Sequence, residues 1–453
     1  MTKMVPQYVS TTNACKLCKP LGASLAFRGV EGAVPFLHGS QGCATYMRRY
    51  IISHFNEPID IASSSLGEKN AVYGGGANLK LGLKNVTEKY HPALIGIATT
   101  CLTETIGDDV KRLLFEYRQE FMQDGGPLLV QVSTPSYSGT HMEGFHAAVR
   151  ALVEQLTEAA DPNSTVNILP GFLSAADLRS LKEIVVDCGL TATVLPDFSE
   201  TLDGPALRDY PLIPKGGTKI SDIRAMSGAK ATVEFGHNTL PEQLSGGKHL
   251  EKAYSVDLHR LGMPVGIRET DRFFEVLGEL SGQPMPEKYA MARGRLVDSL
   301  VDGHKYVFGK RAVVYGEEDL VIGLTSFLAE IGVQPVLCAS GGTSGGFVQA
   351  IEKAVAGFGL EMPRVHEGMD FFEIGELAAE LKPDFFLGHS KGYPLARGLQ
   401  IPLIRAGFPI HDRVGGQRLL HIGYHGAQQL FDLIANVMIA VKQDTSEVGY
   451  SYM

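Results

Sequence analysis

The sequence predicts an α/β fold made of three Rossmann-like, doubly wound domains with mostly parallel sheets. Its length of 453 residues suggests about three domains, because a domain averages roughly 150 residues. Apolar runs that end in small polar residues alternate with stretches of helical periodicity, which is the pattern of parallel strands joined by helices. With 44% hydrophobic and 20% charged residues, the chain can bury cores of this size.

Six apolar runs, taken together with their polar tails, predict buried strands. They lie at 93–101, 127–139, 166–172, 310–316, 334–342 and 383–390. Two stretches with apolar residues at three- and four-residue intervals, 107–122 and 426–441, predict helices. In open α/β sheets the carboxyl ends of the strands form the ligand crevice. We therefore expect the functional site in the polar tails of these strands.

Two shifts in composition predict the domain boundaries. A cluster of Pro, Asn and Ser at 159–167 precedes a new strand, as a linker does. A second shift separates the polar helical stretch at 287–309 from the strand that follows it. The predicted domains are therefore residues 1–162, 163–305 and 306–453.

Charge and hydropathy exclude two classes of partner. The formal net charge of −9 disfavours nucleic acid, because phosphate binding needs a concentrated basic face. No apolar run reaches the roughly 18 residues of a spanning helix, so we expect no membrane partner. The first 20 residues lack the continuous apolar segment of a secretory signal. We expect a cytoplasmic protein with reduced thiols.

Three of the six cysteines, Cys18, Cys43 and Cys101, lie in turn sequences. Their separations of 25 and 58 residues match neither zinc fingers nor ferredoxin runs. They suit ligands offered from separate loops at one end of a sheet, although inert packing of three glycine-flanked cysteines explains the pattern equally well. An iron–sulfur cubane needs four protein ligands, so a second chain would have to complete the set.

The other three cysteines carry weaker signals. Cys188 and Cys338 lie in or beside apolar runs, and we expect both to be buried core thiols. Cys15 stands three residues before Cys18, a spacing that occurs in redox pairs and in half of a zinc site. The chain has no second pair with this spacing. We therefore interpret Cys15 as an incidental neighbour of Cys18.

Several polar residues at the ends of predicted strands have both a structural and a functional interpretation. His38 precedes a glycine and could contact a ligand, although a histidine that satisfies turn backbone is more common. Asp108 and Asp109 are expected to favour the start of a helix through its dipole. His389, Ser390, Lys391 and His411 follow strands and are expected to line the crevice.

Two glycine-rich stretches, 72–80 and 340–346, could form phosphate-binding nests. Neither continues as the GxxxxGK[ST] sequence of a P-loop. We therefore expect no ATP hydrolysis by this chain.

Five stretches together resemble a known family. They are "CKPLGA", the region from "HGSQGCATYMRRY" to "GGGANLKLGL", "TTCLTETIGDD", "TPSYSG" and the closing "IPLIRAGFPIHDRVGGQRLLHIGYHGAQQLFDLIANV". In this order, over nearly the whole chain, they resemble the β-type subunits of nitrogenase component 1, the NifK and NifN family. Within the family, "ACKLCKPLGASLAFRGVEGAVPFLHGSQGCATYMRRY" and "GFPIHDRVGGQRLLHIGY" most resemble NifN, the scaffold subunit for maturation of the iron–molybdenum cofactor.

The resemblance implies an iron–sulfur cluster at a subunit interface, either [4Fe-4S] or the [8Fe-7S] P-cluster type. Cys18, Cys43 and Cys101 stand where the family has its three cluster cysteines, and Ser136 matches the serine that can bind the oxidised P-cluster. Gly39 and Gly42 lack a β-carbon, and we expect them to let the backbone approach this cluster closely. No residue of this chain is expected to act as a catalytic acid or base.

The resemblance also implies partners. A NifE- or NifD-like α-type subunit would complete an α2β2 heterotetramer and hold most of an iron–molybdenum-type cofactor or its precursor. A separate, ATP-dependent iron protein of the NifH type would dock transiently. We expect a maturation scaffold with a NifE-like partner. The alternative is a catalytic, NifK-like subunit of nitrogenase or of a nitrogenase-like reductase, relaying electrons through a P-cluster.

Overall fold

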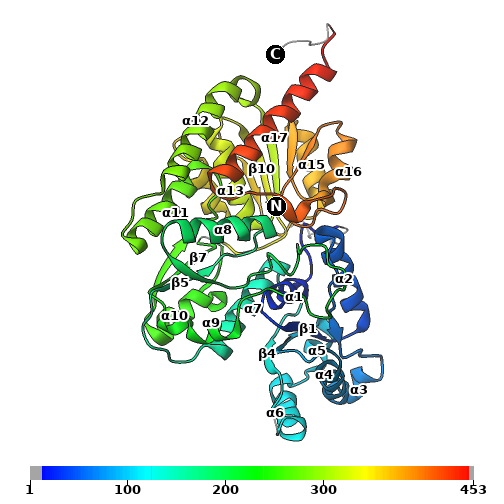
Figure 1. Ribbon diagram of the computed structural model, residues 1–453. Helices are drawn as coiled ribbons and strands as arrows, with labels where there is room; N and C mark the ends of the chain where they lie inside the picture. Colours follow the sequence, from blue (N-terminus) through cyan, green and yellow to red (C-terminus); the bar gives the residue numbers. More distant parts are fainter. Residues whose placement is uncertain (1–12, 124, 238, 448–453) are drawn as a thin grey trace, which may run out of the picture.

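Three all-parallel sheets form the framework of the molecule in the computed structural model, which describes residues 13–123, 125–237 and 239–447. Figure 1 shows the first sheet at the lower right, the second at the lower left and the third above both. Helices cover the faces of each sheet, as parallel strands require. The predicted α/β fold class is therefore confirmed.

The first sheet carries the polar loops that matter most for the site. Its strand order is β2-β1-β3-β4, with β1 (Ala33–His38), β2 (Ala62–Ser63), β3 (Leu94–Thr99) and β4 (Leu128–Val132). The helices of this part are α1 (Lys19–Arg28), α2 (Gln41–Phe55), α3 (Asn70–Tyr73), α4 (Gly76–Tyr90), α5 (Cys101–Ile106), α6 (Val110–Phe121) and α7 (His141–Leu156).

The second sheet has the order β6-β5-β7-β8. Its strands are β5 (Thr165–Leu169), β6 (Thr191–Val194), β7 (Ala231–Phe235) and β8 (Asp257–Leu261). The helices that follow along the chain are α8 (Ala175–Asp187), α9 (Ile220–Arg224), α10 (Gly246–Tyr254), α11 (Gly266–Ser281) and α12 (Glu287–Val307).

The third sheet has the order β11-β10-β9-β12-β13. Its strands are β9 (Arg311–Gly316), β10 (Gln334–Ser340), β11 (Arg364–His366), β12 (Phe385–Gly388) and β13 (Leu403–Arg405). Its helices are α13 (Glu318–Glu330), α14 (Phe347–Val355), α15 (Phe371–Leu381), α16 (Tyr393–Gly398) and α17 (Gly423–Asp444). The long α17 packs against α12 and α11 and so joins the third part to the second.

One large apolar core runs through all three parts of the chain, from Leu17 to Met438. Smaller cores lie on the outer faces of the first and third sheets. The six predicted strands all form, at β3, β4, β5, β9, β10 and β12. The sheets occupy residues 33–132, 165–261 and 311–405, and the boundaries after residues 162 and 305 remain predictions. Within the described ranges, no helix is long and apolar enough to cross a bilayer.

Candidate functional site

The three cysteines of interest each lie at the start of a helix. Cys18 is the N-cap residue of α1, Cys43 is the third residue of α2, and Cys101 is the first residue of α5. The last two follow β1 and β3, so they lie at the carboxyl edge of the first sheet. The partial positive charge of a helix N-terminus favours thiolates and other anions. This edge therefore suits a negatively charged group.

The structure brings these thiols together with Ser136. Burial is the largest cause of the raised pKa of Cys43, and the nearby Cys18 and Cys101 raise it further. Burial also raises the pKa of Cys18, and Cys101 adds to the increase. The Ser136 side chain hydrogen-bonds the Cys18 thiol and lowers its pKa, while the Ser136 backbone N–H donates to Cys101 Sγ at 3.2 Å. Four predicted site residues from separate loops are thus neighbours, and the fifth, Gly42, directly precedes Cys43.

Two glycines set the position of Cys18. A β-carbon on Gly22 of α1 would lie 1.7 Å from the carbonyl oxygen of His141, and one on Gly144 of α7 would lie 1.9 Å from that of Lys19. Real β-carbons are essentially never closer than 3.0 Å to other atoms. Only glycine therefore lets the two helices pack this closely. The close packing fixes the start of α1 beside the start of α7, which follows the loop that carries Ser136.

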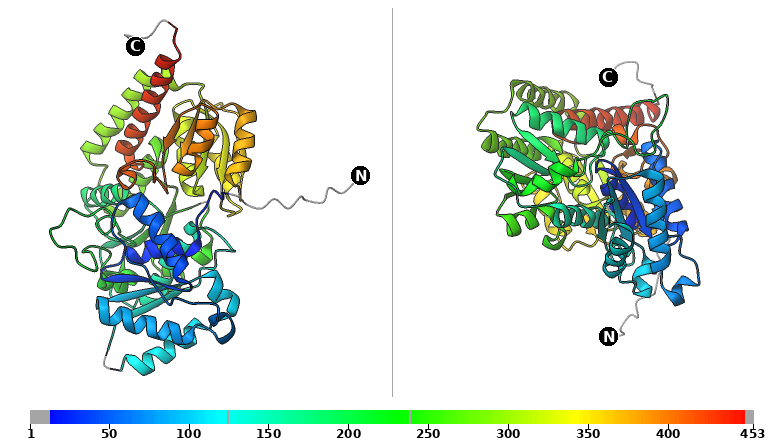
Figure 2. Two further views of the ribbon diagram at one scale, coloured as in Figure 1. Left: turned by 90° about the vertical axis from the view of Figure 1, so that its right-hand side faces the viewer. Right: turned by 60° about the horizontal axis from the view of Figure 1, so that its bottom comes forward.

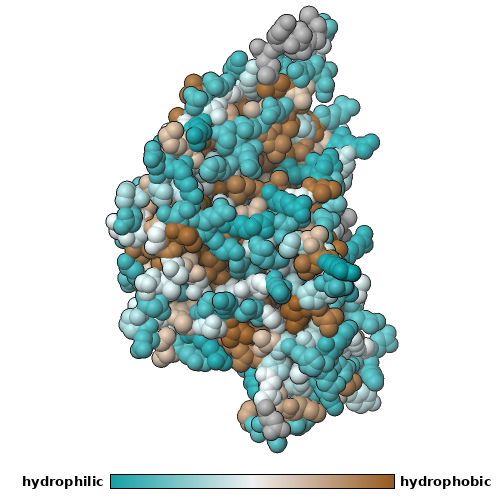
Figure 3. Space-filling view, viewed as in Figure 1, coloured by the Kyte–Doolittle hydropathy of each residue, from teal (hydrophilic) through white to brown (hydrophobic). Residues whose placement is uncertain are grey.

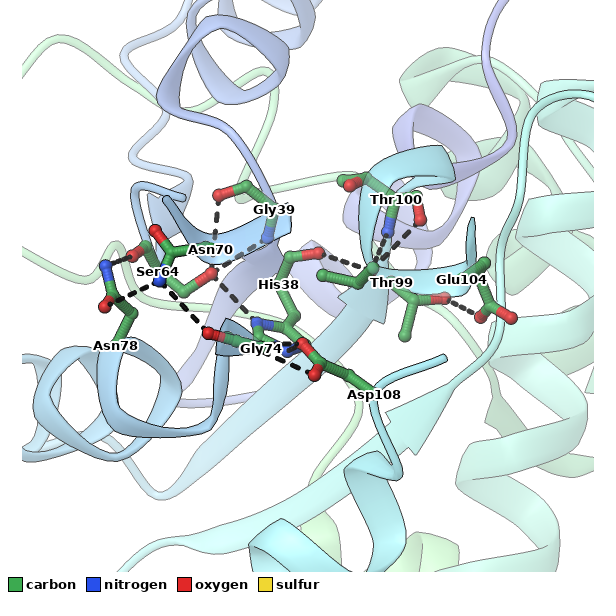
Figure 4. Close-up of polar contacts among 12 residues, drawn as sticks. His38, Gly39, Ser64, Asn70, Gly74, Asn78, Thr99, Thr100, Glu104 and Asp108 are labelled. Carbon is green, nitrogen blue, oxygen red and sulfur yellow. Dashed lines mark hydrogen bonds and ion pairs between the residues drawn. The ribbon is translucent and has the colours of Figure 1, made fainter. Parts of the chain in front are cut away.

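A buried hydrogen-bond network braces the loops around Cys43 and is drawn in Figure 4. His38, which is fully buried, contacts Ser64 Oγ at 2.9 Å through Nδ1 and Asp108 Oδ2 at 3.1 Å through Nε2. The Gly75 N–H donates one bifurcated hydrogen bond to the two carboxylate oxygens of Asp108, and the Gly39 N–H donates to Ser64 Oγ. Burial lowers the pKa of His38, and Asp108 opposes that shift. His38 thus links three loops, as a structural histidine does.

A second set of bonds joins the Cys101 loop to the Ser136 loop. The Thr134 N–H donates to Thr99 Oγ1 at 2.8 Å, and its hydroxyl donates to the Thr99 carbonyl at 2.7 Å. The hydroxyls of Thr99 and Ser133 both donate to Glu104. Thr103 Oγ1 donates to the His38 carbonyl at 2.9 Å, which connects this set to the first. The cysteine-bearing loops are therefore held by the chain itself.

The predicted roles of the acidic pair are half correct. Asp109 is the N-cap residue of α6 and accepts from the Arg112 N–H at 3.0 Å. Asp108 instead turns inward to His38 and Gly75, so the expectation that both favour the helix start is wrong for Asp108. The sequence pattern around Asp108 does not predict its contact with His38, because that histidine lies 70 residues away in the chain.

The glycine-rich stretches already use some of their N–H groups within the chain. Asp108 takes the N–H of Gly75 in the first stretch. In the second stretch Glu318 accepts from Ser344, and Glu367 accepts from the Gly345 N–H at 3.1 Å. These three N–H groups therefore already have carboxylate acceptors within the chain.

The two glycines near Cys43 differ. A β-carbon on Gly39 would lie 2.1 Å from Thr100 Oγ1, so packing against the chain itself explains this glycine and the predicted role beside a cluster is not needed. A β-carbon on Gly42 would meet only Ser40 Oγ, at 3.5 Å. Gly42 is exposed and leaves room next to Cys43 for a group from outside the chain.

The remaining cysteines face the interior. Cys188 and Cys338 are buried, which confirms them as core thiols. Cys15 is 1% exposed, its Sγ lies 3.8 Å from His389 Nε2, and burial raises its pKa to about 12. Cys18, Cys43 and Cys101 are only partly buried.

The donor set fits an iron–sulfur cluster better than a single ion. In the part of the chain that the structure describes, no group of three or more His, Cys, Asp or Glu residues is placed to hold one metal ion. Cys18, Cys43 and Cys101 lie near one another, partly exposed, at helix starts. Thiolates at such a spacing can bind different irons of one cluster, as cysteines do in iron–sulfur proteins. An open side also remains for ligands from a second chain.

Comparisons with known proteins identify the family of the chain. Residues 18–439 match the family described as nitrogenase component 1 type oxidoreductase. The nitrogenase molybdenum-iron protein β chain of Clostridium pasteurianum is 35% identical, covering 94% of this chain and 93% of its own. The vanadium-iron protein β chain of Trichormus variabilis is 36% identical, covering 93% of each chain. A solved structure, nitrogenase Cp1 at pH 6.5, superposes with a TM-score of 0.95 at 33% identity, covering 100% of this chain and 98% of that one.

These relatives correct the finer resemblance and the function expected from it. The similar chains are β chains of molybdenum-iron and vanadium-iron proteins, so the assignment to NifN and to a maturation scaffold is wrong. Of the two stretches that suggested NifN, the first carries Cys15, Cys18 and Cys43, and the second, residues 407–424, carries no cysteine. The same relatives favour the alternative, a NifK-like subunit. The chain belongs to the nitrogenase component 1 oxidoreductase family.

Proposed function

We propose that this chain is the β-type, NifK-like subunit of a nitrogenase and that it holds one side of an interfacial iron–sulfur cluster of the P-cluster type. The observation that carries the proposal is the convergence of Cys18, Cys43, Cys101 and Ser136 at the carboxyl edge of the first sheet. Its relatives are the β chains of nitrogenase proteins.

Each side chain has a definite task in this proposal. The three thiols lose their protons on binding iron, because the metal charge stabilises the thiolate. The Ser136 N–H donates to the Cys101 sulfur, and such bonds to sulfur tune the potential of a cluster. The cluster supplies one-electron transfer when bound. The His38–Asp108 link keeps the loop geometry fixed, so little reorganisation accompanies a change of charge.

An α-type subunit would cover the open side of the thiols. Aromatic side chains near this edge are unusually exposed, with Tyr137 at 67% and Tyr46 at 41%, and the nearby Cys18 contributes to a raised pKa of Tyr46. Large exposed aromatics are typical of protein interfaces. The α-type partner would hold most of the iron–molybdenum-type cofactor, so this chain needs no catalytic acid or base.

A tetramer needs a second contact surface, and the helical face of α12 and α17 offers one. Figure 3 shows hydrophobic side chains, in brown, over this region. Val301 of α12 is 73% exposed, and Leu433 and Val441 of α17 are 41% and 37% exposed. Exposed apolar patches of this kind mark interaction sites. A second copy of the αβ pair would bury them in the proposed α2β2 assembly.

The test is metal analysis with EPR spectroscopy of the complex, co-expressed with its α-type partner and purified without oxygen. We expect iron and sulfide in the amounts of an eight-iron interfacial cluster, in addition to the partner's own cofactor. Zinc without iron, or iron that stays wholly with the separated partner, would reject the proposal.

A further inference from the structure

Residues 13–17, here called the N-terminal strap, cross the carboxyl end of the third sheet just before Cys18. The Cys15 N–H donates to the Met369 carbonyl at 3.1 Å, and the Phe371 N–H donates to the Asn13 carbonyl at 3.0 Å. A β-carbon on Gly341 would lie 2.4 Å from the Cys15 carbonyl oxygen. In the left view of Figure 2 the dark blue start of the chain runs between the blue part below and the yellow and orange part above. The strap thus connects the third sheet to Cys18.

Lys391, which follows β12, contacts carbonyl groups of this strap through its ammonium group. Its Nζ donates to the Ala14 carbonyl and lies 3.5 Å from the Lys16 carbonyl oxygen. The ammonium also lies 5.7 Å from the centre of the Phe371 ring, within cation–π range. No ion pair joins Lys391 to a carboxylate in the described part of the chain. Its charge is therefore not cancelled by a direct partner.

The Lys391 ammonium lies next to the residues that lead into Cys18, because its Nζ is 3.5 Å from the carbonyl oxygen of Lys16, two residues before that cysteine. Lys391 lowers the pKa of both Cys15 and Cys18, against the opposite effect of burial. Burial lowers the pKa of Lys391, whereas Cys15, Glu317 and Cys18 raise it. The side chain is partly buried, so water and salt screen its field less than that of a surface lysine.

The far end of the strap is held independently. The Leu17 N–H donates to His141 Nδ1 at 3.2 Å, and the His141 N–H donates to the Leu17 carbonyl at 3.0 Å. Lys391 therefore acts on residues 14–16, while His141 fixes residue 17 beside Cys18. Loss of Lys391 should loosen the strap without removing its anchor on α7.

We propose that Lys391 is a positioning residue for Cys18 and that its positive charge raises the reduction potential of the cluster bound by the thiols. This rests on the proposed cluster function. Reduction adds negative charge to the cluster, and a fixed cation in a poorly screened site stabilises the reduced form. The strap contacts give Lys391 a second role, because they hold the residues that lead into Cys18.

Three variants separate the two roles in the complex with its α-type partner. Lys391→Arg keeps the charge and the donors, Lys391→Gln keeps donors but loses the charge, and Lys391→Met loses both. Lys310→Met is the matched control, because Lys310 precedes β9 at the opposite end of the third sheet and pairs with Asp384 at 3.0 Å.

Two measurements are needed. EPR-monitored redox titration gives the midpoint potential of the interfacial cluster, and hydrogen–deuterium exchange gives the protection of residues 13–18. We expect a more negative potential in the Gln and Met variants, and wild-type potential in the Arg variant and in the Lys310 control. Exchange of the strap should be faster in the Met variant than in the Gln variant.

The outcomes also separate this inference from the proposed function. An unchanged potential in Lys391→Gln would overturn the electrostatic role, and unchanged strap exchange in Lys391→Met would overturn the positioning role. A wild-type complex without an interfacial cluster would instead overturn the proposed function, whatever the variants do.

Discussion

The close contact of α1 and α7 makes Gly22→Ala a demanding test of how Cys18 is placed. The new methyl group would lie 1.7 Å from the His141 carbonyl oxygen and 2.8 Å from the Phe145 nitrogen. Both are backbone atoms of a helix and cannot move alone. The two helices must separate by about 1.3 Å, the difference between 1.7 Å and the 3.0 Å limit.

Overpacking a tight interior costs about 1–3 kcal/mol, and a rigid backbone neighbour places this site at the upper end. Alanine recovers about 1 kcal/mol through its higher helix propensity. We therefore expect Gly22→Ala to lower the free energy of unfolding by about 2 kcal/mol. The shift should also move Cys18 away from Ser136 and lower the iron content of the complex.

Gly294→Ala is the matched control. Gly294 lies inside α12, is exposed, and has no atom within 4 Å of the position that the new methyl group would take. This substitution should raise stability by up to about 1 kcal/mol. Urea denaturation followed by circular dichroism compares the two variants. Equal midpoints for both variants would refute the close-packing argument for Cys18.

Two further substitutions test buried groups elsewhere in the fold. Burial lowers the pKa of His54 to about 3, so below pH 6.5 only the unfolded chain gains this proton and stability falls. The loss of unfolding free energy reaches about 1.4 kcal/mol at pH 5.5. Between pH 7.5 and 5.5 the urea midpoint should therefore fall less in His54→Gln than in the wild-type protein. An equal fall in both proteins would contradict a neutral, buried His54. Asp177 accepts from the His421 and Ile422 N–H groups and pairs with the His421 ring, so Asp177→Asn should lower the free energy of unfolding by about 3 kcal/mol. The control is Asp187→Asn, which changes an exposed residue of the same helix and should lower the free energy of unfolding by under about 1 kcal/mol in the same assay. Similar losses in the two variants would argue against a stabilising buried pair of Asp177 and His421.

The sequence predicts those parts of the fold that follow from local composition. Strands β3, β9 and β12 are buried on both faces and therefore read as continuous apolar runs. The sequence does not predict strand β1, which lies between β2 and β3, because Pro35 interrupts its apolar run. Strand β8 was not predicted because its sequence, DLHRL, is mostly polar and only partly buried.

In the candidate site, too, the sequence predicts only what local patterns encode. Turn sequences and glycines marked the loops of Cys18, Cys43 and Cys101, but the supporting contacts join residues far apart in the chain. The hydrogen bond from Lys391 to the strap spans 377 residues. Such a contact depends on how the third sheet sits against the first, which no local pattern encodes. The position after β12 indicated that Lys391 lines a crevice, and only the structure shows which segment it holds.

The most direct test of the central claim is the iron content of a Cys43→Ala complex, purified without oxygen together with its α-type partner. Cys338→Ala serves as the control, because Cys338 is a buried thiol in β10 of the third sheet. Cys43→Ala should lose most of the interfacial iron and its EPR signal, while Cys338→Ala retains both. Wild-type iron and an unchanged signal in Cys43→Ala would contradict a cluster held by these thiols.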